Sequence, residues 1–115
     1  MKHLEETVKL LNHIHENPES TQRVLVEELD FSLGKVNYLI KALTEKGIIK
    51  LKSFKSSRKK AGYLYLLTPK GVKKKAEITR KFLEHRLEEY DKLQEEIKML
   101  KMRLKATGES QDWNG

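Results

Sequence analysis

The first stretch of the chain carries an apolar stripe at helical spacing. Between residues 3 and 16, apolar side chains recur three and four positions apart, so they would share one face of a helix. They are Leu4, Val8, Leu11 and Ile14. Pro18 predicts the end of this helix, because the residue before a proline is pushed out of the α region. We expect the helix to serve as a scaffold.

Two further helices are predicted next, joined by a tight turn. Thr21 and Ser32 are suited to cap them, since a hydroxyl can accept from a backbone N–H that lacks a helical partner. Asp30 stands in the turn, where glycine would be more comfortable if φ is positive. Gly47 predicts the end of the helix that Ser32 begins. The expected buried side chains are Val24, Leu25 and Leu29 in the helix after Thr21, Phe31 in the turn, and Leu33, Val36, Leu39, Ile40 and Leu43 in the helix after Ser32.

The pattern then changes to the alternation of a β-hairpin. Residues 48–54 and 63–67 predict two strands joined by a polar loop. Thr68 and Pro69 predict the start of another helix, with Thr68 as the cap and proline at a position where its missing N–H is no loss. A helical pattern continues from there to about Lys105.

This order of elements predicts a fold that is mainly α with a small β-hairpin (α+β). It is a winged helix-turn-helix with a long C-terminal coiled-coil-like helix. We expect a DNA-binding domain over residues 1–71, a dimerisation helix over 72–105 and a disordered tail over 106–115.

The distribution of charge indicates a polyanionic partner. The 115-residue chain has a net charge of +7, and residues 46–75 contain eleven Lys or Arg and no Asp or Glu. Such a block is typical of a surface that neutralises phosphates, although a basic surface can also serve solubility alone. Its position beside a helix-turn-helix pattern favours double-stranded DNA.

The outward face of the helix after Ser32 is small, polar or basic, which suits the major groove, where Asn can pair with adenine and Lys can reach guanine. The basic loop suits phosphate contact or insertion into the minor groove. The predicted DNA-binding residues are Ser32, Gly34, Lys35, Asn37, Tyr38 and Lys41 on the helix, with Lys55, Ser56, Ser57, Arg58, Lys59 and Lys60 in the loop.

The last helix carries apolar residues at a seven-residue repeat, which is typical of a coiled coil. The predicted dimerisation residues are Leu83, Tyr90, Leu93, Ile97, Leu100 and Leu104. In an isolated helix this stripe would lie in water, so it needs a partner chain or must fold back onto the domain. We favour a homodimer over the folded-back arrangement.

Several classes of protein are excluded by what the sequence lacks. No run approaches the eighteen or so apolar residues of a membrane span, so we expect no membrane partner. The absence of cysteine fits a cytoplasmic protein. No phosphate-loop, nucleophile or metalloprotease motif is present. His13 and His15 would point in different directions on a helix. We therefore expect no enzyme activity, no cofactor and no metal.

Several short segments resemble the short MarR-type, exopolysaccharide (EPS)-associated transcriptional regulators. They are residues 32–38, 41–43, 45–47 and 65–71, within a resemblance that covers about residues 5–100. The resemblance implies a dimeric bacterial or archaeal regulator that reads a promoter through its third helix and wing. Larger MarR relatives bind aromatic effectors at a dimer cleft, but this chain lacks the helices that build it. We expect no small-molecule effector.

Two other functions are compatible with the same pattern. Winged helices sometimes join proteins, which would require an exposed apolar patch or acidic residues on the third helix. Non-specific nucleic-acid binding, including RNA binding, would favour exposed aromatic side chains for stacking on bases. Neither feature stands out, and a sequence-specific DNA-binding transcriptional regulator is the favoured interpretation.

Overall fold

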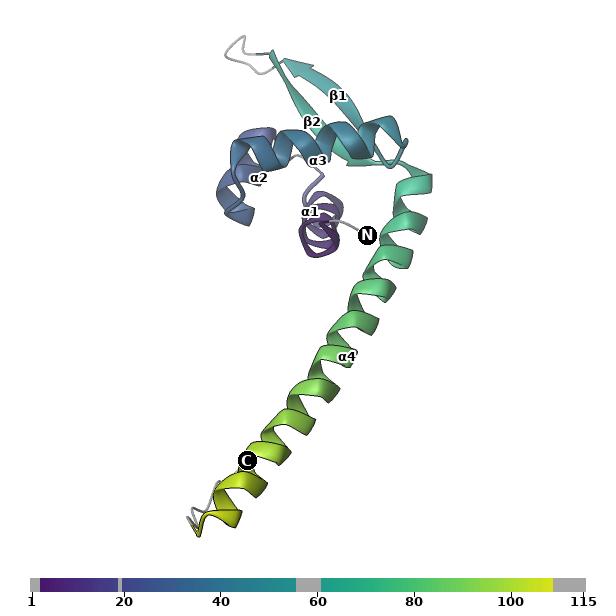
Figure 1. Ribbon diagram of the computed structural model, residues 1–115. Helices are drawn as coiled ribbons and strands as arrows, with labels where there is room; N and C mark the ends of the chain where they lie inside the picture. The colour runs from purple at the N-terminus through teal and green to yellow at the C-terminus, as the bar shows by residue number, and fades with distance from the viewer. Residues whose placement is uncertain (1–2, 19, 56–60, 109–115) are drawn as a thin grey trace. The chain divides into compact units, whose positions relative to one another are not determined.

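The computed structural model describes residues 3–18, 20–55 and 61–108, which form four helices and a two-stranded sheet (Figure 1). The order along the chain is α1 (Leu4–Glu16), α2 (Gln22–Leu29), α3 (Leu33–Glu45), β1 (Ile49–Lys55), β2 (Ala61–Leu67) and α4 (Pro69–Ala106). This is the predicted winged helix-turn-helix with a long C-terminal helix. The chain divides into two units, residues 1–82 and 83–115, and α4 contributes to both.

The helix starts follow the predicted caps. The hydroxyl oxygen of Thr21 accepts from the N–H of Val24 at 3.3 Å, and that of Ser32 accepts from the N–H of Lys35 at 3.1 Å. Thr68 accepts from a backbone N–H of the first turn of α4 in the same way. Asp30 ends α2 with φ of 55°, a left-handed conformation that is uncommon outside glycine.

The end of α3 directs the chain into the hairpin. Gly47 has φ of 72°, which glycine adopts without steric penalty. The N–H of Gly47 donates to the carbonyl of Thr44 at 3.0 Å, and the N–H of Ile48 donates to that of Leu43 at 2.9 Å. These two bonds form a Schellman motif. Gly47 therefore ends the helix as predicted, and Ile48 follows it into the core.

The hairpin is longer than its predicted extent. β1 and β2 pair antiparallel from Ile49 opposite Leu67 to Lys55 opposite Ala61. The expectation that Lys55 lies in the loop is therefore wrong, because backbone pairing continues through this residue. The N–H of Tyr65 also donates to the carbonyl of Ser20 at 3.2 Å, which ties β2 to the segment between α1 and α2.

A single core fills the space between the three short helices, the base of the hairpin and the start of α4. Its buried members are Val8, Leu10, Leu11, Ile14, Leu25, Val36, Leu39, Ile40, Leu43, Ile48, Ile49, Tyr65 and Ile78. Partly buried side chains packed against it include Val26, Leu29, Phe31 and Phe82. The predicted burial of Leu33 is wrong. Its side chain is 57% exposed, because Leu33 is the first residue of α3 and precedes the turns that pack on the core.

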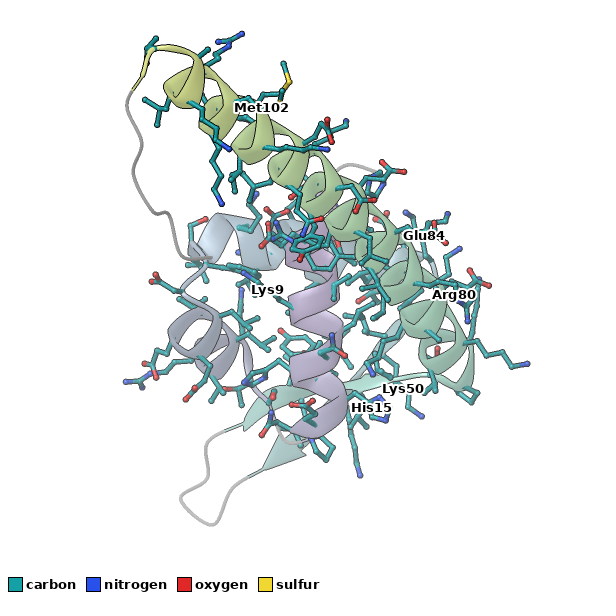
Figure 2. The ribbon with its side chains drawn as sticks, turned by 90° about the horizontal axis from the view of Figure 1, so that it is seen from below. Lys9, His15, Lys50, Arg80, Glu84 and Met102 are labelled. Atoms are coloured by element: carbon teal, nitrogen blue, oxygen red, sulfur yellow. The ribbon has the colours of Figure 1, made fainter. Side chains whose placement is uncertain are left out.

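Beyond Phe82, α4 continues as a single helix to Ala106. The six predicted dimerisation side chains are each 36–56% exposed in the single chain. Arg80, Glu84 and Met102 illustrate how side chains project outward along α4, as Lys9 and His15 do from α1 (Figure 2). No helix within the described ranges is long and apolar enough to cross a membrane.

Candidate nucleic-acid interface

The outer face of α3 is the surface on which the predicted helix contacts gather. Gly34, Asn37, Tyr38 and Lys41 are exposed, and Tyr38 is 57% exposed although it is aromatic. A Cβ added at Gly34 would have no heavy atom within 4 Å, so the backbone here is open to close approach. The face therefore combines an amide, a hydroxyl and an ammonium group around a segment of accessible backbone.

One edge of this face is braced by α2. The side-chain amide of Gln22 donates to the Oδ1 atom of Asn37. Gln22 is the first residue of α2, directly after its cap, and the helix-turn-helix corner brings this end of α2 beside α3. Because Oδ1 of Asn37 is engaged, the amide plane of Asn37 has a defined orientation. Gln22 is absent from the contacts predicted from the sequence, and its position directly after the cap Thr21 is the one signal that points to it.

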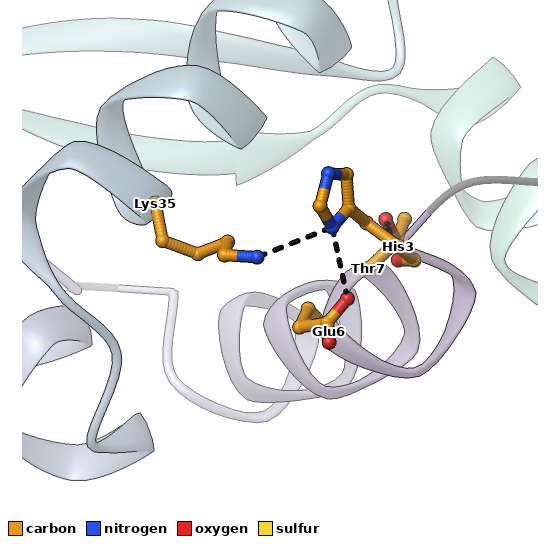
Figure 3. A network of polar contacts seen from close by, with 4 residues as sticks. All are labelled: His3, Glu6, Thr7 and Lys35. Atoms are coloured by element: carbon orange, nitrogen blue, oxygen red, sulfur yellow. Dashed lines mark hydrogen bonds and ion pairs between the residues drawn. The ribbon is translucent and has the colours of Figure 1, made fainter.

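The opposite edge is braced by the start of α1. Figure 3 shows Lys35 reaching from α3 toward α1, with its Nζ atom 3.1 Å from Nδ1 of His3. Nδ1 of His3 also lies 3.4 Å from a carboxylate oxygen of Glu6. The His3 ring also meets the Tyr38 ring edge-on, with centroids 5.5 Å apart. Lys35 is therefore partly buried and directed at α1, unlike the exposed residues in the middle of the face.

The wing presents basic side chains along its first strand. Lys50 and Lys52 are exposed on β1, after the buried Ile49. Lys55 is the last residue of β1 and pairs with Ala61. The other predicted loop contacts, residues 56–60, lie outside the described residues, and their role stays a prediction.

Tyr65 on β2 is a buried member of the core. Burial raises its pKa above the ordinary value of 10.0, because desolvation penalises the phenolate. The phenol therefore stays neutral at physiological pH and acts as a core side chain. Tyr63, two residues earlier on β2, is exposed.

A hollow of about 360 Å³ lies beside the end of α3. It is lined by Lys46, Ile48, Lys70, Lys74, Glu77, Ile78 and Lys81. The ammonium group of Lys70 donates to the carbonyl of Lys46 at 2.9 Å, and that of Lys74 pairs with Glu77 at 3.2 Å. Two of the lysine side chains that line the hollow thus already have partners within the protein. Within the described ranges, no group of three or more His, Asp or Glu side chains could hold a metal ion.

Comparison with known proteins gives these surfaces a context. Residues 7–50 match the family described as winged helix-turn-helix DNA-binding. The matched segment contains the helix-turn-helix. It covers most of α1 and all of α2 and α3, including the outer face of α3, and it ends at the start of β1. The comparison with curated proteins found no match.

Several solved structures share the fold. A PadR-like transcriptional regulator from Bacillus cereus superimposes with a TM-score of 0.69 at 19% identity, over 82% of this chain and 98% of that one. A mutant of ZitR from Lactococcus lactis superimposes with a TM-score of 0.55 at 27% identity, over 94% of this chain and 83% of that one. MepR, a transcription regulator of the Staphylococcus aureus multidrug efflux pump MepA, gives 0.54 at 21% identity, over 89% and 75%. Together with the family match, these neighbours show that the chain has a winged helix-turn-helix fold.

Proposed function

We propose that this protein is a dimeric, sequence-specific transcriptional regulator of the MarR type that binds double-stranded DNA. The observation that carries the proposal is the outer face of α3, which is exposed, acid-free through its first three turns and contained in the matched DNA-binding segment. The side chains that would read DNA lie at its centre, and residues of α1 and α2 brace its edges.

In this proposal α3 enters the major groove, whose width admits a helix. Asn37 reads a base edge, and the orientation imposed by Gln22 determines how the donor and acceptor atoms of the Asn37 amide are presented to the base. Lys41 supplies a cation, and Ser32 with the first N–H groups of α3 holds a phosphate. The open backbone at Gly34 allows the helix to approach the bases closely.

The wing then follows the neighbouring backbone or enters the adjacent minor groove. Lys50 and Lys52 are exposed on β1, which leads toward the basic segment 55–60. Contacts of this kind position the protein on the duplex and make binding depend on salt, but they carry no sequence information.

Dimerisation would place the exposed apolar stripe of α4 against a second copy. The stripe continues over three heptads, from Leu83 to Leu104, and its side chains are about half exposed in the single chain. Pairing removes this apolar surface from water, at about 25 cal/mol for each Å² buried. Two joined domains predict a two-fold related operator with half-sites one or more helical turns apart.

The experiment that tests this function is selection of binding sites from a random duplex library, followed by footprinting of the selected site. We expect a two-fold symmetric site that binds two chains. Asn37→Ala should lower discrimination between this site and random DNA by about 1–3 kcal/mol. The Lys59→Ala, Lys60→Ala double variant should weaken all duplexes alike and flatten the salt dependence. Selection that yields no common site would contradict the proposal.

A further inference from the structure

His3 is anchored by its backbone so that its ring faces α3. It precedes α1 with φ of 61°, a left-handed conformation that is uncommon outside glycine. Its carbonyl accepts from the N–H of Thr7 at 2.9 Å and from the hydroxyl of Thr7 at 2.7 Å. Thr7 is buried, so these two hydrogen bonds attach His3 firmly to the first turn of α1.

The ring has two competing partners on one nitrogen. Nδ1 of His3 lies 3.1 Å from Nζ of Lys35 and 3.4 Å from Oε2 of Glu6 (Figure 3). Lys35 and Tyr38 come from α3 and Glu6 from α1. The ring is thus in contact with an ammonium group, a carboxylate and a phenol.

One nitrogen cannot serve both partners in the same way. A lysine ammonium has only donors, so it needs the lone pair of an unprotonated Nδ1. A carboxylate has only acceptors, so it needs Nδ1 to carry a proton. In the imidazolium form both ring nitrogens carry protons, the contact to Glu6 is strengthened, and Lys35 loses its acceptor and is repelled.

We propose that His3 is a positioning residue for the DNA-binding face, which holds Lys35 against α1 when neutral and releases it toward DNA when protonated. The proposal rests on the function proposed above. Lys35 lies one turn after the cap of α3, and its flexible four-carbon stem allows the released ammonium to reach a backbone phosphate. Histidine suits this role, since its charge changes between about pH 5 and pH 8.

Two measurements on the full chain test the proposal. The first follows the Lys35 side-chain resonances and the His3 ring by NMR during a pH titration of the free protein. We expect the Lys35 signals to shift with the protonation of His3. The second measures duplex affinity against salt at about pH 5.5 and about pH 8, on either side of the range in which imidazole titrates. Release of one lysine should steepen the slope of log affinity against log salt by about 1 at the lower pH.

Three variants isolate the effect. His3→Gln keeps an acceptor for Lys35 that cannot be protonated, so the change in salt slope should disappear. Glu6→Gln replaces the carboxylate with an uncharged amide and so removes the negative charge that stabilises the imidazolium, which should reduce the change in salt slope. His15→Gln is the matched control, because His15 is exposed near the end of the same helix and should leave the change intact. Thermal unfolding of each variant confirms that it is folded.

Failure of this inference can be told apart from failure of the proposed function. Duplex binding with the same salt slope at both pH values would overturn the inference alone. So would a change in slope that persists in His3→Gln, or Lys35 resonances that ignore the titration of His3. Absence of duplex binding at either pH would overturn the DNA-binding function, and with it the release of Lys35 toward DNA.

Discussion

Gly71 lies in the first turn of α4, where the helix backbone passes close to the backbone of Ile48, the residue before β1. A Cβ added at Gly71 would stand 1.9 Å from the carbonyl oxygen of Ile48 and 2.9 Å from its carbonyl carbon. Both are backbone atoms, so no side-chain rotation can relieve the contact. The carbonyl is also held in place, since it accepts from the N–H of Thr68 at 3.1 Å and from its hydroxyl at 3.2 Å.

The Gly71→Ala variant should therefore be less stable than the parent, and the structure bounds the amount. Forcing an extra methyl group into a packed contact costs about 1–3 kcal/mol. Moving the carbonyl of Ile48 weakens its hydrogen bond to the N–H of Thr68, which contributes about 0.5–1.5 kcal/mol net. Against this, alanine is favoured over glycine within a helix by about 1 kcal/mol. We expect the free energy of unfolding to fall by about 1–3 kcal/mol.

The assay is urea unfolding followed by far-UV circular dichroism, with every variant at the same protein concentration, because association shifts apparent stability. Gly34→Ala is the matched control. It makes the same change in α3, where no heavy atom lies within 4 Å of the new Cβ, and should raise stability by about 0.5–1 kcal/mol. A Gly71→Ala variant as stable as the parent would refute the close approach of α4 to Ile48.

Three further predictions concern the edge of α3, the dimer and the core. Gln22→Ala should weaken discrimination between specific and random duplexes only while Asn37 is present. A double-mutant cycle of Gln22→Ala with Asn37→Ala should therefore give a coupling energy of about 0.5–3 kcal/mol. Additive effects of the two substitutions would contradict the contact between these side chains. Leu100→Glu should convert dimers to folded monomers in sedimentation equilibrium, and an unchanged dimer would exclude α4 as the interface. Burial raises the pKa of Tyr65, so stability should be full below the ordinary pKa of 10.0 and fall as pH rises through the folded value. Tyr65→Phe should lessen that alkaline loss in urea unfolding at several pH values, whereas Tyr63→Phe, at an exposed position, should not.

Local rules explain why most of the fold was predictable from the sequence. Thr21, Ser32 and Thr68 accept from helix N–H groups as expected, because capping depends on residues only three apart. Gly47 ends α3 for a similarly local reason. Leu33 was misassigned because helical periodicity places it beside the core face, whereas the first residue of α3 lies beyond the packed core.

The bracing residues of the interface could not be predicted in this way. His3 contacts a residue 32 positions away and Gln22 contacts one 15 positions away, so neither pairing leaves a periodic signal in the sequence. Both contacts depend on how α1 and α2 pack against α3. Lys35 illustrates the consequence, since its residue type and position predicted a groove contact while the fold directs it at His3.

The measurement that tests the central claim most directly is fluorescence anisotropy of the purified protein titrated into duplex DNA from upstream of its own gene. A scrambled duplex of equal length serves as the control, both at about 150 mM salt, where non-specific binding is weak. We predict tight binding to the native duplex alone, at two chains per site. Equal affinity for the two duplexes would contradict sequence-specific recognition at this site, and binding to neither would favour a protein-interaction module.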